Sequence, residues 1–234
     1  GVANASLVGR GAPPVAFDTG PGNAVMDAAA RRASGGRLDF DRDGRLARRG
    51  RADEALVRRL LRLPYFSRRP PKSLDRAAFA EGFLRRWLPV RRFSHEDSLA
   101  TATAFTAASI ADQARRYLLP RARVSEMLVS GGGALNGTLM ARLGELMPVP
   151  VLSSAARGLA PMAKEPALMA VLGLYAVKGR ANNAPRATGA RGPPSAGRES
   201  LLACVLCGAC APACVEDKAC ATGDPASCVD YGQW

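Results

Sequence analysis

The sequence predicts an α/β fold in which helices flank a mixed, largely parallel sheet. Short apolar runs that end in small or acidic residues alternate with longer helical segments, which is the pattern of strands connected through helices. The 234 residues are 47% hydrophobic, enough for a sizeable core. No run approaches the ~20 apolar residues of a membrane-spanning helix, and the N-terminus does not resemble a signal peptide. We therefore expect a cytoplasmic protein with no membrane partner.

The first elements are two short strands followed by a helix. Residues 1–9 and 14–18 are apolar runs joined by a Gly-Ala-Pro-Pro turn, which is typical of paired strands. Pro21 suits the first position of a helix, and the alanine-rich sequence after it continues that helix. Asp18 therefore ends a strand one tight turn before the N-terminus of a helix.

The middle of the chain is predicted to be helical between irregular segments. Residues 34–50 are rich in glycine and aspartate and predict a loop. Short helices are expected at 51–62 and 75–87, separated by prolines that exclude regular structure. A capping box at residues 94–97 opens a long helix that ends at Pro120. The small, nearly uncharged side chains of its first half predict burial on most sides.

Two more pairs of strand and helix complete the predicted domain. A strand near residues 126–130 leads into three glycines and a helix, and a strand near 148–154 leads into a helix that ends near residue 179. Beyond it the chain loses its periodicity and is rich in Asn, Pro, Gly and Arg. We expect residues 1–180 to form one domain and residues 181–234 an irregular tail.

Arginine dominates the net charge of +13, with 29 Arg against 4 Lys. Residues 31–92 alone carry 19 basic and seven acidic side chains, a bias that would attract phosphate-bearing partners. The region matches no DNA- or RNA-binding motif. We interpret it as a solvated basic face and expect no nucleic-acid partner.

Two junctions of strand, glycine turn and helix are the candidate sites, because ligands of open α/β sheets bind beyond the carboxyl ends of the strands. At the first junction, the carboxylate of Asp18 could act as a general base or metal ligand, or could cap the following helix. At the second, the glycines at 131–133 would let a phosphate or a flat ligand approach the backbone, or would form only a tight turn. Spacing alone leaves these alternatives open.

Five sequence strings, in this order, resemble the C-terminal half of the anhydro-N-acetylmuramic acid kinases: FDTGPGNAVMDA, LPYFSRRPPKS, EDSLATATAFTAASIA, VSGGGALN and AKEPALMAVLG. The resemblance extends from residue 1 to about 190. It implies the sugar kinase, heat-shock ATPase and actin superfamily, and hence a ribonuclease-H-like, actin-like C-terminal domain whose N-terminal ATP-binding partner domain is largely missing here. The implied reaction opens 1,6-anhydro-N-acetylmuramic acid with water and transfers the γ-phosphoryl group of ATP to O6. The product is N-acetylmuramate 6-phosphate, an intermediate of cell-wall recycling.

The resemblance also implies roles for individual residues. Asp18 matches the family's catalytic aspartate, which takes a proton from the water that attacks the anomeric carbon. The implied ATP contacts are Asn4, Gly131, Gly132, Gly133 and Asn136, and the implied sugar contacts are Asn23 and Glu165. The implied cofactors and partners are ATP with Mg²⁺, the amino-sugar substrate and a second copy of the chain in a homodimer.

Other positions are interpreted as structural. Thr101, Thr103 and Thr106 on the long helix are expected to pack and to bond to the backbone, although they could line a cleft. His95, the only histidine, is given no catalytic task. The family's usual residues are replaced at Leu74, Asp75, Met162 and Pro166, which puts the sugar contacts in question more than the fold.

Two alternatives compete with the kinase interpretation. The family's Ser-Gly-Thr-Ser-x-Asp-Gly loop, which holds the ATP phosphates, is absent, so we expect little or no kinase activity from these 234 residues alone. The chain could then be a non-catalytic remnant or a regulatory sugar-binding domain. It could also be a metal-binding or iron–sulfur protein, because its tail has the C-x2-C-x2-C-x3-C spacing of ferredoxins, which zinc could use as well. The four cysteines of that motif, in a tail otherwise interpreted as a divergent, disordered extension, are Cys204, Cys207, Cys210 and Cys214.

Overall fold

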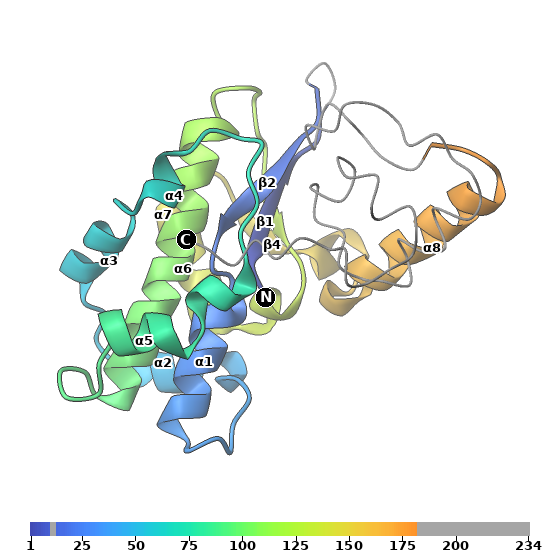
Figure 1. The fold of residues 1–234 in the computed structure, drawn as a ribbon. Helices are drawn as coiled ribbons and strands as arrows, with labels where there is room; N and C mark the ends of the chain where they lie inside the picture. The colour runs from blue at the N-terminus through green and yellow to red at the C-terminus, as the bar shows by residue number, and fades with distance from the viewer. Residues whose placement is uncertain (10–12, 182–234) are drawn as a thin grey trace, which may run out of the picture.

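The computed structural model describes residues 1–9 and 13–181. Its strands and α-helices are, in chain order, β1 (Ala3–Leu7), β2 (Val15–Gly20), α1 (Asn23–Ala33), α2 (Arg45–Arg49), α3 (Glu54–Leu60), α4 (Pro64–Ser67), α5 (Glu81–Trp87), α6 (His95–Tyr117), β3 (Met127–Val129), α7 (Gly137–Leu146), β4 (Val151–Ser153) and α8 (Lys164–Val177). Short 3-10 helices join several of them: η1 (Arg42–Gly44), η2 (Arg76–Phe79), η3 (Gly132–Leu135), η4 (Ser154–Arg157) and η5 (Pro161–Ala163). Figure 1 shows α6 in the middle of the molecule and α8 extending away from it.

The strands of the described residues form two separate two-stranded sheets. β1 and β2 pair antiparallel, in a register that places Asn4 opposite Asp18. β3 and β4 pair in parallel, as expected for strands connected through a helix. The predicted alternation of strands and helices is confirmed. The prediction of a single mixed sheet is wrong for the described residues, whose strands form two sheets. β3 and β4 have three residues each, and within this part of the chain β1 pairs only with β2.

Helix α6 is the centre of the packing. It begins as predicted, because the hydroxyl of Ser94 accepts a hydrogen bond from the amide of Asp97 at 3.0 Å. Most of its length is buried, and its many small side chains let α1, α2, α3 and α7 approach it. The larger core cluster surrounds Phe105 of α6, and a smaller one joins the end of α6 to Phe17 of the hairpin. One helix therefore supports both the helical layer and the β1–β2 sheet.

Two segments predicted to be irregular contain short helices. Residues 45–49 form α2, because the buried carboxylate of Asp41 accepts hydrogen bonds from the amides of Leu46 and Ala47, both at 2.9 Å. Helix α4 forms inside the proline-rich segment, where Pro64 occupies the first helical position. That position needs no amide donor, so proline is tolerated there.

Residues 10–12 and 182–234 lie outside the described part of the chain. The cysteine motif of the tail falls there, so the iron–sulfur and zinc interpretations of Cys204, Cys207, Cys210 and Cys214 stay predictions. Within the described ranges, no three or more His, Cys, Asp or Glu side chains gather as a metal site. None of the helices described is long and apolar enough to cross a membrane.

Candidate active site

Asp18 lies on β2 with a half-buried side chain that is held from two sides. Asn4 Nδ2 donates to its Oδ1 at 3.2 Å, and the amide of Leu74 donates to its Oδ2 at 2.8 Å. Its own amide donates to the carbonyl of Lys72 at 3.1 Å, and its carbonyl accepts from the hydroxyl of Tyr65 at 2.6 Å. A carboxylate has about four acceptor positions. Two of them therefore fix its orientation, and the others remain for water or substrate.

Lys72, which is not among the site residues predicted from the sequence, anchors the loop that contacts Asp18. Its side chain is 8% exposed, and its ammonium nitrogen lies 4.6, 5.3 and 5.9 Å from the ring centres of Tyr65, Tyr117 and Phe17. Nζ also donates to Oε1 of Gln113 at 2.5 Å. Burial lowers the pKa of Lys72 to about 8, so the ammonium form still predominates at neutral pH and attracts the aromatic faces. This aromatic cage fixes the loop against β2.

The turn after β2 is shaped by its contacts with α6 and β1. A Cβ on Gly20 would lie 2.8 Å from the Cβ of Ser109 on α6, and one on Gly22 would lie 2.6 Å from the amide nitrogen of Ala3. Gly22 also has a φ of 53°, so both positions require glycine. The hydroxyl of Thr106 donates to the carbonyl of Gly22 at 2.9 Å, which ties the turn to α6.

Helix α1 begins at Asn23, two residues later than the predicted start at Pro21, with Gly22 as its N-cap. No side chain caps the helix by a hydrogen bond. The alternative that Asp18 serves as the cap of this helix is therefore wrong. Its carboxylate is directed to Asn4 and to the loop that follows Lys72.

A pocket of about 520 Å³ opens between α1, the segment before α2 and the glycine turn before α7. Four apolar side chains, six polar ones and Gly132 line it, and three of the polar side chains are aspartates. The apolar side chains could cover the faces of a flat ligand, and the polar ones could bond to its edges. The lining residues are Asn23, Met26, Asp27, Phe40, Asp41, Arg42, Asp43, Gly132, Leu135, Asn136 and Met162.

The glycine turn and Asn23 meet at this pocket. Gly131 opens the turn with a φ of 78°, which favours glycine. A Cβ on Gly132 would lie 2.9 Å from Nδ2 of Asn23, so the missing side chain lets the amide of Asn23 lie against the backbone. Asn136 is buried and caps α7, because its Oδ1 accepts from the amide of Leu139 at 3.0 Å. Its side chain thus has a structural task beside its place in the pocket wall.

The structure gathers the predicted site residues in two groups. Asn4, predicted as an ATP contact, lies beside Asp18 instead of in the pocket. Asn23, predicted as a sugar contact, lies in the pocket with Gly132 and Asn136. The sequence string FDTGPGN connects the groups, since it contains both Asp18 and Asn23.

The remaining candidates lie elsewhere. Glu165 is exposed near the start of α8, where its Oε1 lies 3.3 Å from Nζ of Lys164, and it lines neither of the pockets described here. Thr101, Thr103 and Thr106 are buried, and their hydroxyls donate to backbone carbonyls. The structural interpretation of these threonines is confirmed.

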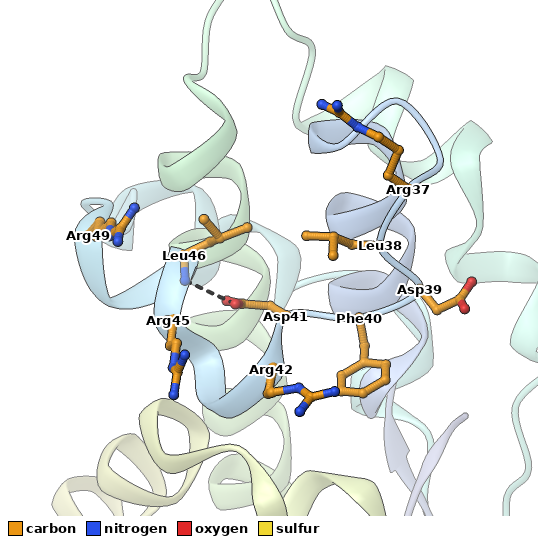
Figure 2. A pocket seen from close by; sticks show the side chains of 9 residues that line it. All are labelled: Arg37, Leu38, Asp39, Phe40, Asp41, Arg42, Arg45, Leu46 and Arg49. Carbon is orange, nitrogen blue, oxygen red and sulfur yellow. Dashed lines mark hydrogen bonds between the residues drawn. The ribbon is translucent and has the colours of Figure 1, made fainter.

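A second pocket, of about 310 Å³, shares Phe40, Asp41 and Arg42 with the first. Figure 2 shows that Arg37 and Arg45, which also line it, point in different directions, while Asp41 turns to the backbone at the start of α2. These guanidinium groups do not converge on one point. We therefore assign no anion to this pocket.

The two groups of residues can combine acid–base chemistry with the binding of a flat ligand. Asp18 presents an oriented carboxylate at one end of a turn that α6 holds, and the larger pocket begins at the other end of that turn. A general base beside a pocket of nucleotide size could activate water or a hydroxyl group toward a bound phosphate donor. Fixed spacing between the two is what such a reaction requires.

Comparisons with known proteins match most of the chain to one family. The family model described as Anhydro-N-acetylmuramic acid kinase matches residues 1–200. Proteins named anhydro-N-acetylmuramic acid kinase from Streptomyces coelicolor and Salinibacter ruber are both 43% identical, over 208 and 197 residues that cover 86% and 81% of this chain. A third, from Caldanaerobacter subterraneus, is 33% identical over 208 residues, 86% of this chain. The aligned parts make up 52%, 49% and 52% of those proteins, so the chain spans about half the length of the curated relatives it matches.

Proposed function

Because the chain belongs to the anhydro-N-acetylmuramic acid kinase family, we propose that it forms the C-terminal half of an ATP-dependent kinase for 1,6-anhydro-N-acetylmuramic acid. In the proposed reaction, water adds to the anomeric carbon and the bond between C1 and O6 breaks. O6 then takes the γ-phosphoryl group of ATP, which leaves ADP and N-acetylmuramate 6-phosphate. The observation that carries the proposal is the carboxylate of Asp18, oriented by Asn4 and Leu74 at the end of β2.

Asp18 is the proposed general base. The attacking water would use one of the acceptor positions that Asn4 and Leu74 leave open, and its proton would pass to the carboxylate as its oxygen bonds to the anomeric carbon. The electron pair of the broken C1–O6 bond stays on O6, which then attacks the γ-phosphorus. The reaction therefore needs the sugar between Asp18 and the phosphate donor.

The proposed ATP site is the larger pocket, at the glycine turn. Its size supports this assignment, as do the four apolar side chains of its wall, which could cover a flat base: Met26, Phe40, Leu135 and Met162. ATP would bring Mg²⁺ with it, since kinases hold this ion mainly through phosphates and water with one or two carboxylates. We assign no residue of this chain as its ligand. Gly131, Gly133 and Asn136 complete the proposed contacts, and Glu165 stays a predicted sugar contact.

Lys72 is a positioning residue in this proposal. Its aromatic cage and its bond to Gln113 fix the loop whose carbonyl and amide groups hold Asp18 on both sides. Because it lies within the protein core and acts through the loop, it would set where the carboxylate points and would not touch the sugar. Loss of the cage should therefore lower turnover more than substrate affinity.

The proposal is tested by reassembling the kinase from two parts. The chain is co-expressed with the half of the Streptomyces coelicolor protein that has no counterpart here. Conversion of the anhydro sugar and ATP to the 6-phosphate and ADP is followed by mass spectrometry. Asp18→Asn keeps the shape of the side chain and should reduce turnover at least a hundredfold, the range expected for loss of a general base.

The matched control is Asp39→Asn, an exposed aspartate on the loop after α1, which should leave turnover unchanged. Equal activity of the Asp18→Asn and parent assemblies would exclude Asp18 as the base. Binding of the anhydro sugar without any turnover by the parent assembly would favour the alternative of a non-catalytic sugar-binding domain.

A further inference from the structure

Three apolar side chains of the larger pocket remain open to water. Phe40, Leu135 and Met162 are 54%, 57% and 59% exposed. They come from three separate segments, the loop before η1, η3 and η5, and all three line this pocket. Large apolar side chains that gather around a hollow and stay exposed are typical of a ligand contact. These three could cover the faces of a flat ring.

The charges of the pocket wall determine which part of a nucleotide it can hold. Asp27, Asp41 and Asp43 line the pocket together with one cation, Arg42. Three carboxylates in one wall repel a triphosphate, whose charges have the same sign. If ATP binds here, its phosphates therefore lie away from these aspartates, and its base is the part that the apolar side chains cover.

Most polar side chains of the wall already bind to the protein itself. Both carboxylate oxygens of Asp41 accept hydrogen bonds from amides of α2, at 2.9 Å each. One oxygen of Asp43 accepts from the amide of Gly137 at 3.1 Å, and the other pairs with an arginine of α2 at 3.3 Å. The side-chain oxygen of Asn136 caps α7, and Asp27 also has a partner within the protein. These groups are held by the protein and are not reserved for the edge of one particular base.

Two polar side chains of the wall remain available to a ligand. Those of Asn23 and Arg42 form no hydrogen bond or ion pair with other described residues. The amide of Asn23 carries donors on one side and an acceptor on the other, and a half-turn of the amide exchanges them. It can therefore pair with the amino group of adenine or with the carbonyl oxygen of guanine. Arg42 can only donate, and both purines offer the acceptor N7.

We propose that this pocket accepts guanine as well as adenine, so that GTP serves beside ATP as the phosphate donor. The inference rests on the proposed function, which assigns the pocket to the nucleotide. Strong rejection of a wrong base requires a buried polar group that only the right base satisfies. Among the described residues, the buried side-chain polar atom without a partner is Oγ of Ser154, which does not line the pocket.

The test is a competition between nucleotides in the kinase reassembled with the unmatched half of the Streptomyces coelicolor protein. The assembly receives the anhydro sugar, Mg²⁺ and equal concentrations of ATP and GTP, and mass spectrometry follows ADP and GDP. Their ratio is the ratio of kcat/KM for the two donors. We expect it to stay below about a hundredfold, as for an apolar pocket, whereas a site that hydrogen-bonds one base discriminates by about 10⁴–10⁵. A larger preference for ATP would overturn the inference.

Variants of the apolar wall show whether the base lies where we place it. Phe40→Ala and Leu135→Ala should each raise KM for both donors at least about fivefold, the lower end of the loss expected when a base loses a stacking side chain. The ratio between the donors should stay the same. Leu38→Ala is the matched control, because Leu38 is 44% exposed on the same loop and does not line the larger pocket. It should leave both KM values unchanged. Unchanged KM values for the two wall variants would also overturn the inference.

Nucleotide binding separates this inference from the proposed reaction. All residues named for the pocket belong to this chain, so the full chain alone can be loaded with trinitrophenyl-ATP, which ATP or GTP then displaces. Displacement by both, with Kd values less than about a hundredfold apart, keeps the inference even if the assembly does not turn over, and only the reaction is then removed. Turnover with ATP and none with GTP keeps the reaction and removes the inference. Failure of both nucleotides to displace the probe removes the assignment of the pocket and the inference with it.

Discussion

Replacing Lys72 by methionine should remove a pH dependence from the free energy of unfolding. The ammonium group of Lys72 is buried among Tyr65, Tyr117 and Phe17. Desolvation lowers its pKa from 10.5 to about 8, while Asp112 acts in the opposite direction. Between these two pH values the unfolded chain binds one proton more than the folded chain. The free energy of unfolding of the parent protein must therefore rise with pH in this window.

The size of the effect follows from the shift. One pKa unit corresponds to about 1.4 kcal/mol. The deprotonation of Lys72 therefore raises the free energy of unfolding by about 3 kcal/mol in total, a value reached above pH 10.5. About 2 kcal/mol of this rise develops between pH 7.5 and 9.5. Burial and the nearby Asp18 raise the pKa of Tyr65, which lowers stability only above pH 10, outside this window. Near pH 7, Lys72→Met should change the free energy of unfolding little, because two effects offset each other. The variant no longer pays the cost of burying a charge, but it leaves the buried side-chain oxygen of Gln113 without its hydrogen-bond donor.

The measurement is urea unfolding of the full chain, followed by circular dichroism at pH 7.5, 8.5 and 9.5. Thiols and the α-amino group titrate in both proteins, so their effects cancel in the difference between parent and Lys72→Met. That difference should grow by about 2 kcal/mol across the window. Lys178→Met, at an exposed lysine outside the cage, serves as the control and should follow the parent curve. Parallel curves for the parent and Lys72→Met would refute the reasoning that burial dominates the ionisation of Lys72.

Three further predictions test other parts of the structure. Gly22→Ala should lower the free energy of unfolding by about 2–4 kcal/mol, because it combines a φ of 53° with a clash against Ala3; a loss below about 1 kcal/mol in urea unfolding would contradict this geometry. Asp41→Ala should lower the free energy of unfolding by about 1–2 kcal/mol. It should also speed hydrogen exchange at the amides of Leu46 and Ala47, which lose their acceptor. Unchanged exchange at these two amides would exclude Asp41 as the residue that caps α2. The 234 residues alone should give no measurable conversion of the anhydro sugar with ATP and Mg²⁺, and steady turnover by the purified chain would show that one half of the family's length suffices.

Local patterns predicted the order of the elements well. The cap at Ser94 and the small side chains after it identified α6 and its burial, and the alternation of apolar runs placed the strands within a few residues. Helix α2 was missed because its start depends on Asp41, whose carboxylate reaches two amides of the following turn inside a segment that otherwise has the composition of a loop. The separation of the strands into two sheets could not be predicted, since strand pairing depends on contacts distant in the sequence.

The candidate site was predictable only in part. Asp18 was singled out by its place between strand and helix, but spacing alone could not exclude that it caps the helix. Its hydrogen bonds with Asn4 and Leu74 exclude the cap, and its role as a base stays a prediction. Lys72 was missed because a lysine that follows two arginines and two prolines resembles any exposed cation. Its burial depends on aromatic rings from three separate elements. The one available signal was the position of this lysine in a segment rich in aromatic and proline residues.

One face of α6 sets the distance between the two ends of the candidate site. Thr106 binds the carbonyl of Gly22 beside the pocket, and Gln113, two turns later on the same face, binds Lys72 below the carboxylate. The rise of a helix over seven residues is about 10 Å, and this rise does not change when the connecting loops move. Insertion of a single residue between these positions would rotate one contact about 100° away from the other. Evolution can therefore vary the loops around this site in length, but the interval between Thr106 and Gln113 has to stay constant.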